Sequence, residues 1–508
     1  MSFTETCQRI VRDPLLSPAQ KSHALALAAE NALPYPELPA EVSEAMAKGF
    51  VCDMFEGHAP YKPRYVLPDY EKFLRQGSAW LELAPPQDFD EALDALRILY
   101  HHVPSVTGMP VWLGRLDHLL LPFVGELDDE ALYRKLKGFW IYLDRVLPDA
   151  FMHVNIGPDD NRLCRLILRI DGELKQAAPN LTLFHDPAQT PDSLLLQGVQ
   201  NIAACSKPHI ANYPLHRNTF DERGFGIVSC YNALPQAGGA NTLVRVSLKR
   251  VAEQAHGIDD FLGCLLPHYC RLASRLIEAR AAFLHQESGF FDSFLVQEGL
   301  LEEDRFVPMF GIYGMAEAVN LLMDKENLPE RYGRDEEANQ LGYRISAQLA
   351  RHVSETPQRH AWGGRALLHS QGGLSVDCGV TPGVRIPYGE EPDPASHVLA
   401  LAPHHGFYHS GISEILTLDP TIRQNPQALL QLCKGALAIG MREFTANVAD
   451  SDLVRVTGYM IRKSDVARFA AEGSRLQTTC LGAEASELTG IRQRAPRVVG
   501  REATLCDY

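Results

Sequence analysis

The stretch Arg455-Val456-Thr457-Gly458-Tyr459, followed by Met460-Ile461-Arg462-Lys463, decides how this sequence is interpreted. An apolar, helix-like segment follows at 464–471. The ordinary interpretation is the end of a strand with a glycine turn, since glycine adopts backbone conformations that other residues avoid. A second interpretation depends on chemistry that only glycine offers. A radical on a backbone Cα is delocalised over both flanking amides and needs a planar centre without a clashing side chain.

The pentapeptide resembles the signature of glycyl radical enzymes, whose pattern is Arg-Val-x-Gly-Tyr near the C-terminus. Two earlier segments are similar to segments of that superfamily and occur in the same order. They are Leu113-Gly114-Arg115-Leu116-Asp117 and the run from Asn155-Ile156-Gly157-Pro158 to Pro179-Asn180-Leu181. The resemblance spans about 110–470. It is closest to the YjjI family, whose substrate is unassigned, and more distant from anaerobic ribonucleotide reductase and pyruvate formate-lyase.

The resemblance implies an α/β fold, a ten-stranded α/β barrel of two half-barrels with additional N-terminal helices. Alternation of short apolar segments with helical patterns independently favours an α/β architecture. We expect an N-terminal helical region at 1–100, the barrel core with a finger loop at 101–430, and a C-terminal glycyl radical region at 431–508. Helical patterns cover 24–33, 41–54, 128–147, 160–176, 259–284 (broken or kinked at Pro267), 316–324 and 336–353, and strand patterns cover 181–184, 226–229 and 243–246.

A second glycine competes for the radical. Arg497-Val498-Val499-Gly500-Arg501 also reads Arg-Val-x-Gly, but Arg501 stands where the signature has tyrosine. Only eight residues follow Gly500, too few for the helix that should come next. We therefore predict the radical on Gly458.

A glycyl radical acts through a nearby thiol, because the S–H bond is comparable in strength to the C–H bonds involved. The chain has 11 cysteines and no C-x-x-C pair, so the sequence contains no zinc ribbon or thioredoxin-like motif. Cys230 follows a short strand pattern, and the segment 238–250 resembles the one that follows the thiyl cysteine in the reductase branch. The segment 207–213 resembles the one before it. We predict Cys230 as the thiyl carrier, with Cys205 as the alternative.

Departures from the superfamily narrow the chemistry. The decarboxylase, diol dehydratase and choline lyase branches have a glutamate two residues after the thiyl cysteine, which acts as general base. This chain has Asn232 at that position, and a neutral amide cannot take up a proton at neutral pH. Pyruvate formate-lyase uses adjacent cysteines, where this chain has Ser229. Anaerobic reductases have a four-cysteine zinc site before the glycyl loop, where only Cys433 lies nearby. Nucleotide reduction is therefore an alternative function.

Five residues are predicted to bind substrate: Asn212, Asn232, Glu317, Arg385 and His405. Asn212 belongs to the reductase-like segment, and Glu317 closes a Gly-x-x-Gly-x-x-Glu pattern, although it could also be a helix-capping glutamate. Arg385 could bind a carboxylate or phosphate with both guanidinium nitrogens. His405 and His409 have i, i+4 spacing, but no third ligand is evident, so no metal site is predicted.

Composition limits the remaining classes. The net charge is 48 − 63 = −15, which argues against nucleic acid or an anionic membrane as partner. No apolar run reaches the roughly 18 residues of a membrane span, and the first residues lack the pattern of a secretory signal. We expect a cytoplasmic homodimer without a bound cofactor, a small-molecule substrate, and a radical S-adenosylmethionine activase that installs the radical. The alternative outside enzymology is a metabolite-binding barrel without radical chemistry.

Overall fold

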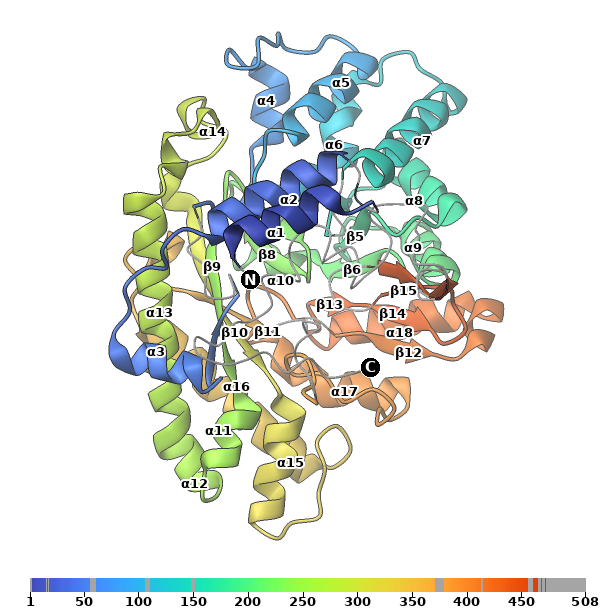
Figure 1. Ribbon diagram of the computed structural model, residues 1–508. Coiled ribbons are helices and arrows are strands. Elements are labelled where there is room, and N and C mark those ends of the chain that lie inside the picture. Colours follow the sequence, from blue (N-terminus) through green and yellow to red (C-terminus); the bar gives the residue numbers. More distant parts are fainter. Residues whose placement is uncertain are drawn as a thin grey trace.

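Figure 1 shows the computed structural model of the protein. It describes residues 2–14, 16, 18–54, 61–105, 110–147, 151–370, 379–412, 414–455, 460–464, 467 and 471. The predicted radical glycine Gly458 and its competitor Gly500 both lie outside these residues.

The first of two five-stranded sheets has the order β13-β6-β5-β4-β3. Strands β3 to β6 are parallel to their neighbours, and β13 pairs with β6 in the antiparallel sense. Helices α7, α8 and α9 lie between these strands in the sequence, as parallel strands require. The bounds are β3 (Trp112–Arg115), β4 (His153–Ile156), β5 (Asn180–His185), β6 (His209–Asn212), β13 (Glu443–Phe444), α7 (Asp129–Val146), α8 (Arg162–Leu174) and α9 (Asp192–Cys205).

The second sheet contains β1 (Val51–Asp53), β2 (Tyr65–Leu67), β9 (Gly238–Ser247), β10 (Phe306–Tyr313) and β11 (Leu367–Ser370). Strands β9, β10 and β11 are parallel, and β1 and β2 are antiparallel to β9. Side chains alternate between the two faces of a strand. Val244, Phe310 and Leu368 therefore pack in one hydrophobic cluster with α13 (Leu266–Glu287), α15 (Met315–Lys325) and α16 (Glu336–Glu355).

A hairpin of β7 (Phe225–Val228) and β8 (Asn232–Pro235) forms the finger that carries Cys230. Asn155 on β4 binds both backbone groups of Ile227 in β7 at 2.9 Å. Ala233 in β8 donates to the carbonyl of Ser410, whose own N–H bonds to Leu368 in β11. The finger is thus attached to both sheets, and β8 is drawn between β9 and β6 in Figure 1.

The segment around the signature forms a second hairpin, which we call the radical hairpin. Its strands are β15 (Leu453–Arg455) and β16 (Met460–Arg462), which pair in antiparallel fashion with Arg455 opposite Met460. Residues 456–459, including Gly458, connect these two strands in the sequence. The neighbouring strands β12 (Leu416–Leu418) and β14 (Ala446–Val448) pair with each other in parallel.

Most predicted helices and strands are confirmed within a few residues, but the helix predicted at 41–54 is wrong in its second half. Helix α3 ends at Ala47, and Val51–Asp53 form β1 because they pair with β9. The helix predicted at 259–284 to be broken or kinked at Pro267 is continuous in its backbone but changes from π-helical to α-helical geometry just before that proline. A π-helical turn at Phe261–Leu265 precedes α13, and Pro267 lies in the first turn of that helix, where its missing N–H costs no hydrogen bond.

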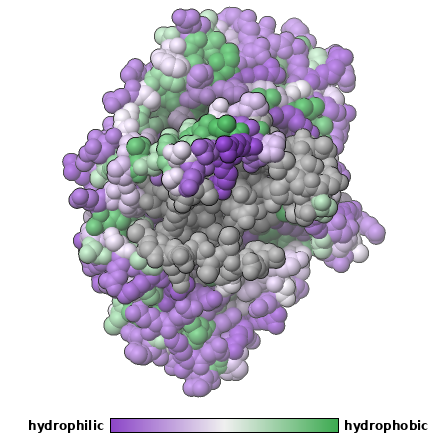
Figure 2. All heavy atoms as spheres, viewed as in Figure 1, coloured by the Kyte–Doolittle hydropathy of each residue, from purple (hydrophilic) through white to green (hydrophobic). Residues whose placement is uncertain are grey.

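The remaining helices surround the sheets (Figure 1). They are α1 (Phe3–Arg12), α2 (Pro18–Asn31), α3 (Ala40–Ala47), α4 (Tyr70–Gln76), α5 (Phe89–Tyr100), α6 (Leu116–Leu120), α10 (Tyr213–Arg217), α11 (Leu248–Gln254), α12 (Ile258–Asp260), α14 (Phe294–Gln297), α17 (Pro394–His405) and α18 (Pro426–Ala438). Within the described ranges, no helix is both long and apolar enough to span a bilayer. The coloured part of the face in Figure 2 is mostly hydrophilic.

Candidate active site

Cys230 lies at the tip of the finger. Val228 and Asn232 are the last paired residues, so the turn contains Ser229, Cys230 and Tyr231. Ser229 and Tyr231 have φ values of 50° and 63°, a left-handed conformation that costs residues with side chains about 1–3 kcal/mol each. The side-chain amide of Asn232 donates to the Val228 carbonyl at 2.9 Å and closes the turn. The thiol of Cys230 is thereby presented at a strained, well-supported tip that is only 6% exposed.

Contacts from both sides hold this tip. The Tyr65 hydroxyl in β2 donates to the Ser229 hydroxyl at 3.3 Å. On the other side, the backbone of Gly411 packs against the Tyr231 carbonyl. A Cβ at Gly411, whose φ is +104°, would lie 1.7 Å from that oxygen. Only glycine allows this approach, because any side chain would collide with the finger.

The radical hairpin meets the finger at Tyr231. The guanidinium carbon of Arg455, the first residue of the signature, lies 5.4 Å from the centre of the Tyr231 ring. The same guanidinium donates to Asn180 Oδ1 at 2.9 Å and to the Ser206 carbonyl at 3.2 Å. The ring of His209 packs on Tyr231 with 4.5 Å between centroids. The structure therefore brings the residue after Cys230 into contact with the strand that leads to Gly458.

A buried chain of polar side chains runs beside Tyr231 across the first sheet. Thr182 Oγ1 lies 2.6 Å from His153 Nε2 and 2.9 Å from His209 Nδ1. Glu443 bridges two histidines, with its carboxyl oxygens 2.6 Å from His209 Nε2 and 3.1 Å from His216 Nε2. Sequence analysis missed this chain, because its members come from β4, β5, β6, α10 and β13 and share no local motif.

Burial decides the charge of this chain. It raises the pKa of Glu443 well above its ordinary value, against the opposing effect of Arg442. It lowers the pKa values of His153, His209 and His216 well below theirs. Removing a charge from water is expensive, so the neutral forms are favoured on all four side chains. Burial therefore disfavours the charged form of each of these four side chains.

Of the predicted substrate residues, Asn232 belongs to the finger, and contact with substrate stays a prediction for it and for Arg385. Asn232 closes the turn that carries Cys230. Burial lowers the pKa of Arg385, while the charges of Glu414, Tyr231 and Cys230 raise it. The thiol of Cys230 is thus among the groups whose charge acts on Arg385.

The other three predicted residues are tied to the scaffold. Asn212 donates from its side-chain amide to the Leu437 and Met441 carbonyls at 3.0 and 3.1 Å. His405 Nδ1 accepts from the backbone N–H of Arg442 at 3.0 Å. Glu317, in the first turn of α15, accepts from the Thr381 N–H at 2.8 Å. These bonds place them in supporting positions, and contact with substrate stays a prediction for all three.

The alternative thiol, Cys205, lies at the end of α9 and packs with Leu453 and Met460 of the radical hairpin. Its Sγ donates to the Asn201 carbonyl at 3.3 Å. Burial raises the pKa of Cys205 to about 12, so it remains a thiol at neutral pH. Cys205 thus borders the radical hairpin at a different place from Cys230, which is on the finger.

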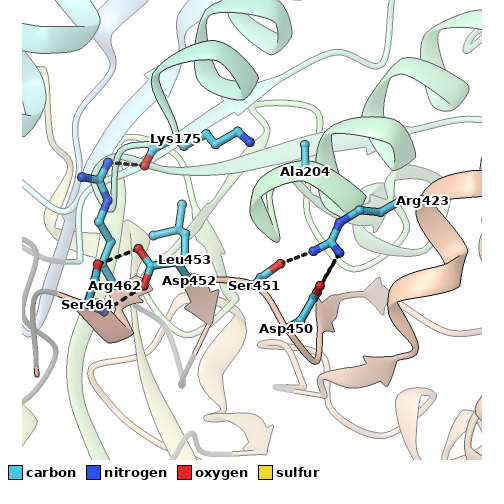
Figure 3. Close-up of a pocket in the computed structure, with 9 residues that line it drawn as sticks. All are labelled: Lys175, Ala204, Arg423, Asp450, Ser451, Asp452, Leu453, Arg462 and Ser464. Atoms are coloured by element: carbon cyan, nitrogen blue, oxygen red, sulfur yellow. Dashed lines mark hydrogen bonds and ion pairs between the residues drawn. The ribbon is translucent and has the colours of Figure 1, made fainter.

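Figure 3 shows a hollow of about 630 Å³ beside the radical hairpin. Its polar groups largely bind one another: Arg423 pairs with Asp450, and Ser464 bonds to Asp452. None of its nine lining residues belongs to the finger. The lining residues are Lys175, Ala204, Arg423, Asp450, Ser451, Asp452, Leu453, Arg462 and Ser464. The hollow borders β15 and β16, and we do not assign it to the substrate of Cys230.

Within the residues that the structure places, no group of three or more His, Cys, Asp or Glu side chains is arranged to hold a metal ion. The histidines of the polar chain are engaged with Thr182 and Glu443.

Comparison with known proteins places the chain among relatives. The model of the family "Glycyl radical enzyme YjjI-like" matches residues 16–497. The YjjI protein of Escherichia coli K12 is 60% identical over 502 residues, which cover 99% of this chain and 97% of that protein.

Solved structures share the fold at low identity. Hydroxyproline dehydratase from Clostridioides difficile, with trans-4-hydroxy-L-proline bound, matches with a TM-score of 0.70 at 12% identity, covering 96% of this chain and 88% of that chain. The anaerobic ribonucleotide reductase from Thermotoga maritima, in complex with dATP and CTP, matches with a TM-score of 0.65 at 11% identity, covering 91% and 88%. These matches confirm the predicted α/β fold, with its two sheets of five strands.

Proposed function

The chain belongs to the YjjI-like family of glycyl radical enzymes, and from this premise we propose that Gly458 carries the radical and Cys230 delivers it to substrate. A radical S-adenosylmethionine activase removes a hydrogen atom from Gly458. The glycyl radical then takes a hydrogen atom from Cys230, and the thiyl radical takes one from a small polar substrate. At the end of the cycle the hydrogen atom returns to the substrate-derived radical.

The contact between Tyr231 and Arg455 is the observation that supports this proposal best. Cys230 and the strand leading to Gly458 are far apart in the sequence, yet their neighbours touch at 5.4 Å. Hydrogen-atom transfer between two groups requires close approach, and a shared anchor keeps that approach reproducible. The burial of Cys230 also suits radical chemistry, because an enclosed site excludes solvent and oxygen from reactive intermediates.

The proposed substrate contacts are assigned by their position relative to the finger. Arg385 and Asn232 are the proposed binding residues near the thiol, and Asn212, Glu317 and His405 are proposed at its margin. The backbone radical is the only redox group that this mechanism needs. By analogy with the family, we propose a homodimer that works anaerobically in the cytoplasm.

Activation tests the proposal directly. The full chain is incubated anaerobically with a radical S-adenosylmethionine activase and examined by electron paramagnetic resonance. We expect a glycyl doublet in the wild type, none in Gly458→Ala, and an undiminished doublet in Cys230→Ala, whose turnover should be abolished. Cys270→Ala is the matched control, since Cys270 is buried on α13 among the outer helices.

Exposure of the activated protein to air separates the two candidate glycines. Oxygen should cut the chain at the radical glycine, and mass spectrometry of the short fragment then identifies the position. A cut at Gly500 would contradict the assignment to Gly458. Absence of the doublet with several competent activases would favour a metabolite-binding barrel, and reduction of nucleotides by the activated protein would favour the reductase alternative.

A further inference from the structure

His369 is a fully buried histidine on β11 that faces the finger. Strand β11 pairs in parallel with β10, so that Leu368 lies opposite Phe310 and His369 opposite Gly311. Leu368 and Phe310 pack toward the outer helices. Because side chains alternate, His369 points to the other face, on which Leu367 packs against a cluster that contains Ile227, Tyr231 and Ala233 of the finger.

A shared carbonyl fixes His369 near the finger and sets its tautomer. His369 Nδ1 lies 3.1 Å from the Ser410 carbonyl, which also accepts from the Ala233 N–H of β8 at 3.0 Å. A carbonyl only accepts, so Nδ1 carries the hydrogen and Nε2 carries the lone pair. Nε2 is buried and has no hydrogen-bond partner among the described residues.

A buried acceptor without a partner is unfavourable, and a donor group on a ligand can satisfy it. The protonation state of His369 agrees with an acceptor role. Burial lowers the pKa of His369 to about 4, against the opposing bonds to the Ser410 and Gly411 carbonyls. The imidazole is therefore neutral at pH 7, and Nε2 can accept a hydrogen bond.

The surroundings restrict the donor. Across the sheet, Arg245, Gly311 and His369 occupy three neighbouring positions, and the middle one has no side chain. Arg245 is fully buried, and the charge of Arg64 also acts on His369. The positive charge of Arg64 that acts on His369 disfavours a cationic donor such as an ammonium group there, whereas it does not disfavour a neutral hydroxyl.

We propose that His369 Nε2 accepts a hydrogen bond from a hydroxyl group of the substrate and holds the carbon that bears it toward Cys230. The substrate is therefore a hydroxylated compound, such as a diol, polyol or hydroxy acid. This inference rests on the proposed thiyl role of Cys230. It adds a substrate contact from β11 that no sequence motif indicated.

Binding to the unactivated full chain tests the inference without turnover. Ligand-observed NMR compares pairs of probes that differ by one hydroxyl: trans-4-hydroxy-L-proline with proline, 1,2-propanediol with 1-propanol, and hydroxy acids with their deoxy counterparts. We expect at least one hydroxylated probe to bind more tightly than its partner. His369→Phe keeps a flat ring without the acceptor and should weaken that probe about tenfold, while leaving the deoxy probe unchanged.

His369→Gln supplies a carbonyl acceptor of similar reach and should restore part of the preference. His352→Phe is the control, because His352 lies on α16 and packs against Phe310 on the opposite face of the same sheet. If no hydroxylated probe is preferred, or if His369→Phe binds it as the wild type does, the inference is wrong. A melting curve shows whether His369→Phe is poorly folded. In that case the inference is decided by comparing the preference for the hydroxylated probe in His369→Gln with that in His352→Phe.

Activation of the same variants keeps the two proposals apart. A glycyl doublet that forms in His369→Phe, together with lost hydroxyl preference, supports both. A normal doublet with unchanged preference overturns only the role of His369. Absence of the doublet in the wild type overturns the radical function and with it the premise of this inference.

Discussion

The contact of Tyr231 with Arg455 predicts how fast the protein can be activated. Arg455 and Met460, the residues that flank the segment with Gly458, are buried to 2% and 1% exposure, and we expect the activase to act on Gly458 when the radical hairpin has left its place. Replacing Tyr231 by leucine removes the aromatic face that Arg455 covers. It leaves the bonds of Arg455 to Asn180 and Ser206 intact.

A desolvated cation–π contact contributes roughly 2 kcal/mol. Since 1.36 kcal/mol corresponds to a factor of ten, its loss should raise the population of the released hairpin about 30-fold. If release limits activation, the glycyl doublet of Tyr231→Leu should appear up to about 30 times faster than that of the wild type. Tyr231→Phe keeps the ring and should activate within about twofold of the wild type.

The assay is the initial rate of doublet formation by electron paramagnetic resonance under anaerobic conditions, with limiting activase. Melting curves of the unactivated proteins must show that Tyr231→Leu is folded. A wild-type activation rate in a folded Tyr231→Leu would refute the reasoning, because it would mean that this contact does not hold the radical hairpin.

Two further predictions concern the supports of the finger. Gly411→Ala places a Cβ 1.7 Å from the Tyr231 carbonyl oxygen and should lower the free energy of unfolding by at least about 2 kcal/mol. Gly440 has a similar φ of +103° but no atom within 4 Å of the added Cβ, so Gly440→Ala should lower the free energy of unfolding less. Urea titrations of both variants measure these losses, and equal losses would contradict a collision at Gly411. The pKa of Glu443 is raised in the folded protein, so above about pH 4.5 the unfolded chain releases a proton that the folded chain keeps. The contribution of the protonated Glu443 to stability is therefore present at low pH and is lost as pH rises through the folded-state pKa. The free energy of unfolding should therefore fall more steeply between pH 5 and 8 in the wild type than in Glu443→Gln, and parallel slopes would show that Glu443 is ionised in the folded protein.

Local patterns in the sequence predicted the secondary structure well where periodicity was strong. Helices α7, α8, α15 and α16 agree with their predicted ranges, because apolar residues at helical spacing and acidic N-terminal residues determine such helices locally. The stretch 41–54 was different. Val51–Asp53 became a strand through pairing with β9, and that partner lies nearly 200 residues away. The domain boundaries at 100 and 430 stay predictions.

The predicted site residues also differ in how far neighbouring sequence indicated their surroundings. Asn232 and Arg385 were predicted from neighbouring residues; Asn232 closes the turn that carries Cys230, and a substrate role for either residue stays a prediction. Asn212 and His405 came from the same kind of reasoning, but their side chains bind the backbone before β13. A motif identifies a polar residue, but it does not show which of its hydrogen bonds the surrounding backbone will occupy.

The sequence by itself determined the family and the two proposed radical carriers. Gly458 is identified by residues adjacent to it, and Cys230 by segments close on either side, so no folded structure was needed to select them. Tertiary structure decided what surrounds them: the contact of Tyr231 with Arg455, the buried polar chain through Glu443, and the orientation of His369. These partners come from strands and loops far apart in the chain, and only packing of the two sheets around the finger brings their side chains within bonding distance.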